Sequence, residues 1–227
     1  MQLTHSTLHY HIMKSLVDAG TAPSIKDIAE KFGRSANEIA TALEDLQEYH
    51  GVVLHPKSKE VWVMHPFSTA PTNFFIKSAD CCWWGNCAWC SLGAAALLKR
   101  DLTITTTSGA EANQITLQIK NGQLDNPKLL VHFPIPMVQA WDNVTYTCSN
   151  MLLFESEAEI IDWCKRHKMA VGDIQTIENI WQFSKVWYGN HLREDWHKWT
   201  SEEASMLFKQ FGLKGRIWDI PSVSGRF

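Results

Sequence analysis

Helix-capping signals in the first 65 residues constrain the fold more than any other feature of this sequence. Apolar residues recur at helical spacing between residues 8 and 17. Ser24 and Ser35 each begin a capping signal for a further helix, with an acidic residue three positions later. Two short β-type runs follow between residues 52 and 65. Three helices and a β-hairpin predict a winged-helix-like domain over residues 1–65.

The rest of the chain mixes β-type and helical patterns. Residues 66–80, rich in Pro, Ser and Thr, predict a linker, and residues 81–227 a second domain with a Trp-rich helical tail. A small apolar run at residues 87–98 predicts a buried helix, and further capping signals begin at Ser156 and Thr200. The strands expected are 102–107, 114–119, 129–133 and 145–154. We therefore expect an α+β fold, with the winged-helix-like domain followed by a mixed or antiparallel sheet with flanking helices.

Composition and charge exclude several classes of protein. Hydrophobic residues make up 45% and charged residues 20% of the chain, as in ordinary globular proteins. The net charge is −3, and the candidate recognition helix at residues 35–50 carries four acidic residues and no Lys or Arg, which argues against nucleic-acid binding. No apolar run reaches the roughly 18 to 20 residues that span a bilayer, and the N-terminus does not resemble a secretory signal, so we expect no membrane partner and a cytoplasmic location.

Six cysteines point to thiol or metal chemistry. Four of them lie within ten residues, at Cys81, Cys82, Cys87 and Cys90. A C-x2-C pair chelates zinc or another soft metal, but a structural zinc site needs a second pair, which the sequence lacks. His5 and His9 have ligand spacing but belong to the other domain, and buried packing remains the alternative interpretation of each cysteine.

Two cysteines stand out as a candidate pair. Cys90 lies near the start of the predicted 87–98 helix, where the helix dipole lowers the pKa of a thiol. Cys148 lies in the apolar, β-like run at residues 145–154. A pair of thiols suits a soft metal better than oxygen or nitrogen ligands do.

These residues carry a resemblance to organomercurial lyase (alkylmercury lyase). The segment around Cys90 with its small apolar helix, and Cys148 before the Met-Leu-Leu-Phe run at 151–154, are its most specific part, and the likeness extends over roughly residues 10 to 215. The resemblance implies cleavage of a carbon–mercury bond: two cysteine thiolates bind the mercury of the substrate, and an acid protonates the leaving carbon. It implies a small organometallic substrate, Hg(II) as the product bound by the protein, and no external cofactor.

The sequence departs from the family at the acid. The family's aspartate falls three residues after the first cysteine, where this chain has Gly93. Candidate replacements for the acid are Cys87, which could also be a third thiol, Asp80, Ser91 and Asp142. Trp89 and Gly93 are expected in the pocket. If proton delivery limits the rate, Gly93→Asp should accelerate cleavage.

Two other functions stay open. One is a thiol protein that binds a soft metal through Cys87, Cys90 and Cys148 without turnover, and the other is a winged-helix regulator whose cysteines sense metal or redox state. The oligomeric state cannot be predicted.

Overall fold

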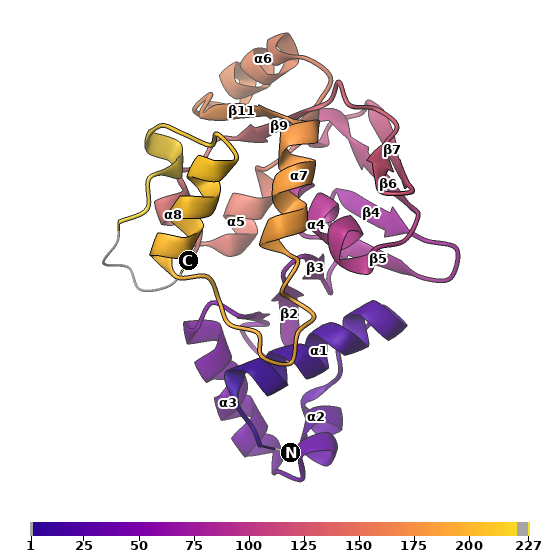
Figure 1. Cartoon of the computed structure of the whole chain (residues 1–227), viewed down its shortest axis with the longest axis vertical. Coiled ribbons are helices and arrows are strands. Elements are labelled where there is room, and N and C mark those ends of the chain that lie inside the picture. Colours follow the sequence, from indigo (N-terminus) through magenta and orange to yellow (C-terminus); the bar gives the residue numbers. More distant parts are fainter. Residues whose placement is uncertain (1, 222–226) are drawn as a thin grey trace.

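The computed structural model describes residues 2–221 and 227. Three capped helices open the chain: α1 (His5–Ala19), α2 (Ile25–Phe32) and α3 (Ala36–Glu48). Their N-caps are Thr4, Ser24 and Ser35, and in each case the cap and the third helical residue bond to one another's backbone. These helices form the lower part of the molecule in Figure 1.

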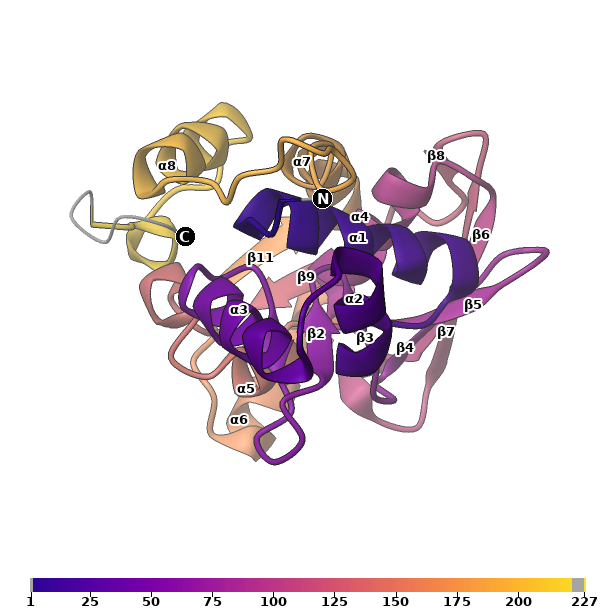
Figure 2. The ribbon, with the colours of Figure 1, turned by 90° about the horizontal axis from the view of Figure 1, so that it is seen from below.

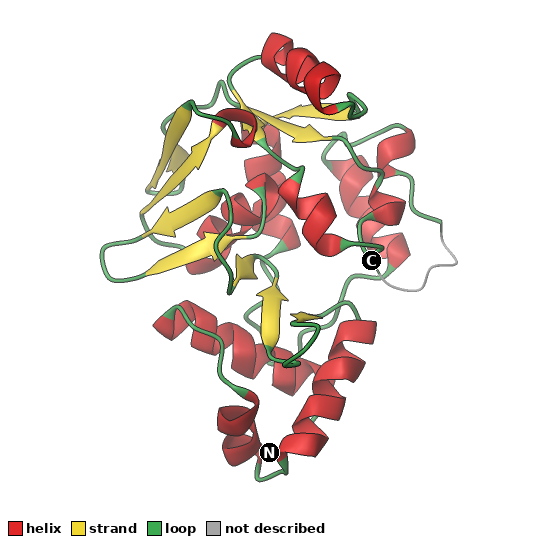
Figure 3. Cartoon of the chain, turned by 180° about the vertical axis from the view of Figure 1, so that it is seen from behind, coloured by secondary structure: helices red, strands yellow, loops and turns green. Residues whose placement is uncertain are grey.

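A single antiparallel sheet connects this helical part to the rest of the chain. Its strand order is β1-β2-β3-β5-β4-β6-β7-β8. The sheet rises from the N-terminal helices along one side of the molecule (Figure 3). Its strands are β1 (Val53–Leu54), β2 (Val61–Met64), β3 (Phe67–Ser68), β4 (Phe74–Lys77), β5 (Cys82–Gly85), β6 (Leu102–Thr107), β7 (Gln114–Lys120) and β8 (Gln123–Leu124).

A second, three-stranded antiparallel sheet lies at the far end of the molecule (Figure 1). It pairs β9 (Leu130–Phe133) with β10 (Leu153–Phe154) on one side and β11 (Asp173–Thr176) on the other. The remaining helices are α4 (Ala88–Leu98), α5 (Val144–Ser149), α6 (Glu157–His167), α7 (Ile177–Trp187) and α8 (Ser201–Gln210), with short 3-10 turns at Ser108–Ala110, Met137–Gln139 and Arg216–Trp218.

Helix α4 is the centre of the core. Ten of its eleven residues are buried, which fits a helix whose sequence is apolar on every face. It packs against α7 and against strands of the larger sheet. Gly93 allows this close approach, because a side chain there would overlap Tyr188, the residue that follows α7.

The Trp-rich segment after α7 closes the molecule. The loop between α7 and α8 reaches down to α1 (Figures 1 and 2), where Trp196 stacks on His9 with ring centroids 3.5 Å apart. Trp199 donates a hydrogen bond to the Trp187 carbonyl, and Trp218 packs on Phe133 of the small sheet. Several tail tryptophans therefore join parts of the core that are distant in sequence.

The α+β class with antiparallel sheets is confirmed, as are the helix at 87–98 and the strands at 102–107, 114–119 and 129–133 within a residue or two. Two predictions are wrong. Residues 145–154 form helix α5 and only a two-residue strand, because Asn143 caps a helix there and accepts from the Tyr146 N–H. Residues 66–80 are not an irregular linker, since they contribute β3 and β4 to the sheet. The winged-helix identity of residues 1–65 stays a prediction.

Within the described residues, no helix is both long enough and apolar enough to cross a bilayer.

Candidate functional site

Cys90 is placed by the start of α4. It is the third residue of the helix, and its backbone N–H donates to the Sγ of Cys87, the N-cap, at 3.3 Å. The Cys90 side chain is 2% exposed. The expectation that Cys90 lies at a helix N-terminus is therefore confirmed, and the fixed cap sets the direction of its side chain.

Cys148 reaches the same place from α5. The chain turns back after this helix, and the Ala88 N–H at the start of α4 donates to the Met151 carbonyl at 3.0 Å. This bond holds the segment carrying Cys148 against the helix carrying Cys90. Cys148 is buried, and both cysteines are free thiols.

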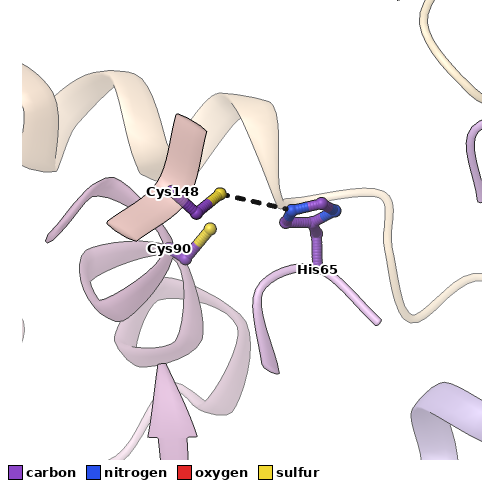
Figure 4. Close-up of side chains that lie close together, drawn as sticks. All are labelled: His65, Cys90 and Cys148. Atoms are coloured by element: carbon purple, nitrogen blue, oxygen red, sulfur yellow. Dashed lines mark hydrogen bonds between the residues drawn. The ribbon is translucent and has the colours of Figure 1, made fainter. Parts of the chain in front are cut away.

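A histidine completes a group of three close ligand atoms. His65 follows β2, and its Nε2 lies 3.8 Å from Cys148 Sγ and 3.2 Å from Asn86 Nδ2. The two sulfurs and a ring nitrogen of His65 all lie within 4.8 Å of one another. Figure 4 shows both sulfurs pointing toward each other and toward the ring. Metal–thiolate bonds are about 2.3 Å long for zinc, so sulfurs this close can share one soft ion.

The hydrogen bonds of His65 define its chemistry. The Asn86 amide nitrogen can only donate, so His65 Nε2 acts as an acceptor. Burial lowers the pKa of His65, and the neighbouring Cys90 charge acts in the opposite direction. The Asn86 amide and the Cys148 thiol, 3.8 Å away, therefore share the one acceptor position of Nε2.

The two thiols differ in charge. Burial alone would raise the pKa of Cys90, but hydrogen bonds from Cys148 and Cys87, the charge of His65 and a hydrogen bond from Tyr188 outweigh it, and the pKa lies well below the usual value. A hydrogen bond with Cys87 favours the thiolate of Cys148, but its bond to Cys90, burial and the Cys90 charge prevail and raise the pKa of Cys148. Of the two sulfurs, Cys90 is therefore the one that its surroundings favour as the thiolate.

Tyr188, directly after α7, is the third group on Cys90. Its hydroxyl lies 3.4 Å from Cys90 Sγ. Its ring lies over Gly93, where a Cβ would be 2.2 Å from two of the ring carbons. Burial and the neighbouring Cys90 charge raise the pKa of Tyr188 well above its usual value, so the phenol keeps its proton.

These groups line one narrow cavity that opens to the surface. Its walls are mostly aromatic and apolar, with a few polar groups. Burial lowers the pKa of Lys198 to about 7, and its Nζ lies 4.3 Å from the centroid of the Trp141 ring. Further lining residues include Trp89, Met137, Val144, Met151, Trp187 and His191.

Most of the residues expected at the site meet there. Cys87, Cys90, Cys148 and Trp89 line the cavity, and Gly93 lies beneath Tyr188. Cys87 lies beside this trio: its sulfur caps α4 and interacts with the Cys90 and Cys148 thiols.

The other candidate site residues, an aspartate, two cysteines and two histidines, lie outside the cavity. Asp80 is exposed in the turn between β4 and β5 and does not line the cavity, so the structure does not support it as the proton donor. Cys82 is exposed on β5, and Cys81 lies just before it. His9 packs in the core against Trp196 instead of binding a metal with His5.

Three residues of the site escaped the sequence analysis: His65, Tyr188 and Lys198. Each comes from a segment far in sequence from Cys90, and none stands in a recognisable motif. The absence of a side chain at Gly93 was the one available signal, because it implied that another residue fills that space.

Comparison with known proteins places these residues in a family. The model of the alkylmercury lyase family matches residues 67–189, which is more than half of the chain and includes Cys90 and Cys148. The chain belongs to the alkylmercury lyase family. A comparison with curated proteins gave no significant match.

The fold agrees with membership of the alkylmercury lyase family. The mercury-bound crystal structure of MerB2 superimposes with a TM-score of 0.65 at 17% sequence identity, over 84% of this chain and 89% of that one. At this identity the likeness concerns the fold. Because the coverage extends beyond residues 67–189, the flanking N-terminal and C-terminal segments share in that likeness.

Proposed function

We propose that this chain is an organomercurial lyase, which cleaves the carbon–mercury bond of a small organomercurial by protonolysis. The observation that carries the proposal is the pair of buried sulfurs, Cys90 and Cys148, within 4.8 Å of each other in the part of the chain that the family model matches. The apolar walls of the cavity suit the organic group, and the sulfurs suit the mercury.

The charges at the site suggest the order of steps. Cys90, as the thiolate, binds the mercury of the incoming substrate first. Cys148 then becomes the second ligand and loses its proton, with His65 Nε2 beside it as acceptor. Two thiolates on the mercury weaken its bond to carbon, and protonation of that carbon releases a hydrocarbon and leaves Hg(II) on the two sulfurs.

No step of this scheme requires an external cofactor, since thiols of the chain supply both the metal ligands and the net proton. We propose Cys90 and Cys148 as the residues that act on the substrate, and His65 as the residue that assists Cys148. Cys87 serves mainly to cap α4.

The experiment is a single-turnover reaction with phenylmercury, in which released benzene and protein-bound mercury are both quantified. We expect stoichiometric benzene from the unaltered chain and none from Cys90→Ser or Cys148→Ser, because a hydroxyl is a poor ligand for a soft metal. Cys82→Ser, at an exposed cysteine outside the cavity, is the matched control and should keep full activity. Tight mercury binding without benzene would refute the lyase and favour a sequestering protein.

Two further features belong to this proposal. The free thiols fit a reducing compartment, which supports a cytoplasmic location. We also propose that residues 1–65 form a winged-helix-like domain whose role is structural. Trp83 donates a hydrogen bond to the Leu16 carbonyl of α1, and His9 of α1 stacks on Trp196 of the tail. The acidic α3 supports a role other than nucleic-acid binding.

A further inference from the structure

Gly93 and Tyr188 compete for one volume beside Cys90. Gly93 is in the second turn of α4, and a Cβ built on it would lie 2.2 Å from Cδ2 and Cε2 of Tyr188 and 2.9 Å from Cγ. Real atoms do not approach so closely, so Tyr188 keeps its present position only because residue 93 has no side chain. Any side chain at residue 93 would point into the space that the tyrosine ring fills.

The hydroxyl of that ring is aimed at the reacting sulfur. Tyr188 Oη lies 3.4 Å from Cys90 Sγ, within hydrogen-bonding distance for sulfur. A mercury bound to Cys90 adds about 2.3 Å, taking the zinc–thiolate bond as a guide, so the hydroxyl stands beside the atoms bonded to that mercury. Tyr188 also lines the cavity that would hold the organic group.

The ring is held firmly in this position. Tyr188 is 2% exposed, and its backbone N–H bonds to the Ser184 carbonyl at the end of α7. Trp89 and His191 pack against the ring with centroid distances of 6.0 and 4.9 Å. A donor fixed by packing on several sides is preorganised for proton transfer to one point.

Other groups are less well placed to donate the proton. Lys198 also lines the cavity, with its ammonium group over the face of Trp141 and under the influence of the Cys90 charge, so it is the donor that the variants below must be compared with. The Cys87 sulfur accepts the Cys90 N–H as a helix cap and approaches Met151 Sδ at 3.8 Å. His65 is an acceptor toward Cys148.

We propose that the Tyr188 hydroxyl delivers the proton to the leaving carbon, in the space that Gly93 leaves open. This inference rests on the proposed lyase function. The O–H proton passes to the carbon, and the electron pair of the carbon–mercury bond becomes the new C–H bond. Mercury remains as Hg(II) on the Cys90 and Cys148 sulfurs. The proton that Cys148 loses on binding mercury, with His65 beside it as acceptor, balances the proton that the phenol gives up. A single turnover therefore consumes one thiol proton and leaves Hg(II) on the two sulfurs.

The direct test replaces only the hydroxyl. Tyr188→Phe keeps the ring over Gly93, and Tyr146→Phe, at an exposed tyrosine of α5, is the matched control. In single-turnover reactions with phenylmercury we expect Tyr188→Phe to release benzene at least about 100-fold more slowly, the usual contribution of a general acid. In a Cys81→Ser and Cys82→Ser background, which removes the exposed thiols, it should still bind one phenylmercury per chain by intact mass. Tyr146→Phe should stay within about twofold of the unaltered chain.

The alternatives give different results. Benzene release by Tyr188→Phe within about threefold of the unaltered rate overturns the proposal. So does a loss of more than about 100-fold in Lys198→Gln with no loss in Tyr188→Phe, since the ammonium group would then be the donor. If the unaltered chain binds phenylmercury but releases no benzene, the lyase function itself fails and this inference fails with it.

A second pair of variants tests the shared volume. Tyr188→Ala removes the hydroxyl and opens the space over Gly93, and adding Gly93→Asp places a carboxyl there. We expect the double variant to release benzene at least about tenfold faster than Tyr188→Ala, while equal rates would contradict a common role for the two positions.

Discussion

The packing of Tyr188 on Gly93 predicts that Gly93→Ala destabilises the chain when Tyr188 is present and stabilises it when Tyr188 is replaced by alanine. Gly93→Ala gains about 1 kcal/mol of intrinsic helix stability, because alanine is favoured over glycine inside a helix. The new methyl group would lie 2.2 Å from two ring carbons of a buried tyrosine, and relieving such overpacking costs about 1 to 3 kcal/mol. The overlap involves the body of a fixed ring, so we take the upper half of that range. The net effect expected is a destabilisation of about 1 to 2 kcal/mol.

The same substitution should stabilise the chain once the ring is gone. In Tyr188→Ala the helix gain of about 1 kcal/mol remains, and the added methyl fills part of the cavity for about another 0.8 kcal/mol. The interaction energy between the two positions is then about 3 to 4 kcal/mol, at or just above the upper end of what contacting residues show.

The assay is urea unfolding of the unaltered chain, the two single variants and the double variant, followed by tryptophan fluorescence. The free energies of unfolding are compared with a common m-value. Tyr188→Ala alone should cost about 3 to 5 kcal/mol, as for other buried aromatic side chains, so low temperature keeps it folded. Destabilisation by Gly93→Ala in both backgrounds, or stabilisation in both, would refute the overlap. The same overlap revises the expectation for Gly93→Asp, which must displace Tyr188 before it can supply an acid.

Three more predictions concern buried polar groups. The pKa of Lys198 is about 7 in the folded chain, below its unfolded value, so the unfolded chain binds more protons between about pH 7 and 10. Stability therefore rises with pH in that range. Lys198→Met should remove up to about 1 kcal/mol per pH unit of this slope, measured by urea unfolding at several pH values. Burial and the charge of Lys198 likewise lower the pKa of His9, so stability should fall as the pH drops below about 6.5. His9→Phe should weaken that fall, and an unchanged dependence of stability on pH would contradict the assignment. Cys87→Ser retains a capping oxygen and should stay within about 0.5 kcal/mol of the unaltered chain, whereas Cys87→Ala should lose about 1 kcal/mol; equal losses would show that the cap is unimportant.

Local signals made much of the fold predictable. Ser24, Ser35, Ser156 and Thr200 each cap a helix as expected, because a cap is satisfied within four residues and needs no distant partner. Strands β6 and β7 were also found from their own alternation and the turn between them.

The failures arose where tertiary structure overrides propensity. Residues 145–149 favour a strand by composition, yet Asn143 caps a helix whose inner face packs Cys148 into the site. Strands β3 and β4 are short and lie among prolines and serines, so only their pairing with β5 reveals them.

Only some of the site residues could be predicted from the sequence. Cys90 was identified from its place at the start of a predicted helix, and its joint role with Cys148 came from the resemblance to alkylmercury lyase. His65 and Tyr188 reach them from β2 and α7, and nothing local to either residue marks it as part of a site. Gly93 shows how a missing side chain can be informative: the acid expected there is absent, and the structure shows an ionisable hydroxyl in its space.

The most direct test of the central claim is to measure released hydrocarbon and the ligands of the retained mercury in the same sample. After one turnover with phenylmercury, X-ray absorption at the mercury edge should show two sulfur neighbours in the unaltered chain, with one benzene released per mercury bound. In Cys148→Ser the account predicts phenylmercury held by a single sulfur and no benzene. Benzene release from Cys148→Ser, or retained mercury without two sulfur ligands in the unaltered chain, would contradict the assignment of Cys90 and Cys148 as the pair that cleaves the bond.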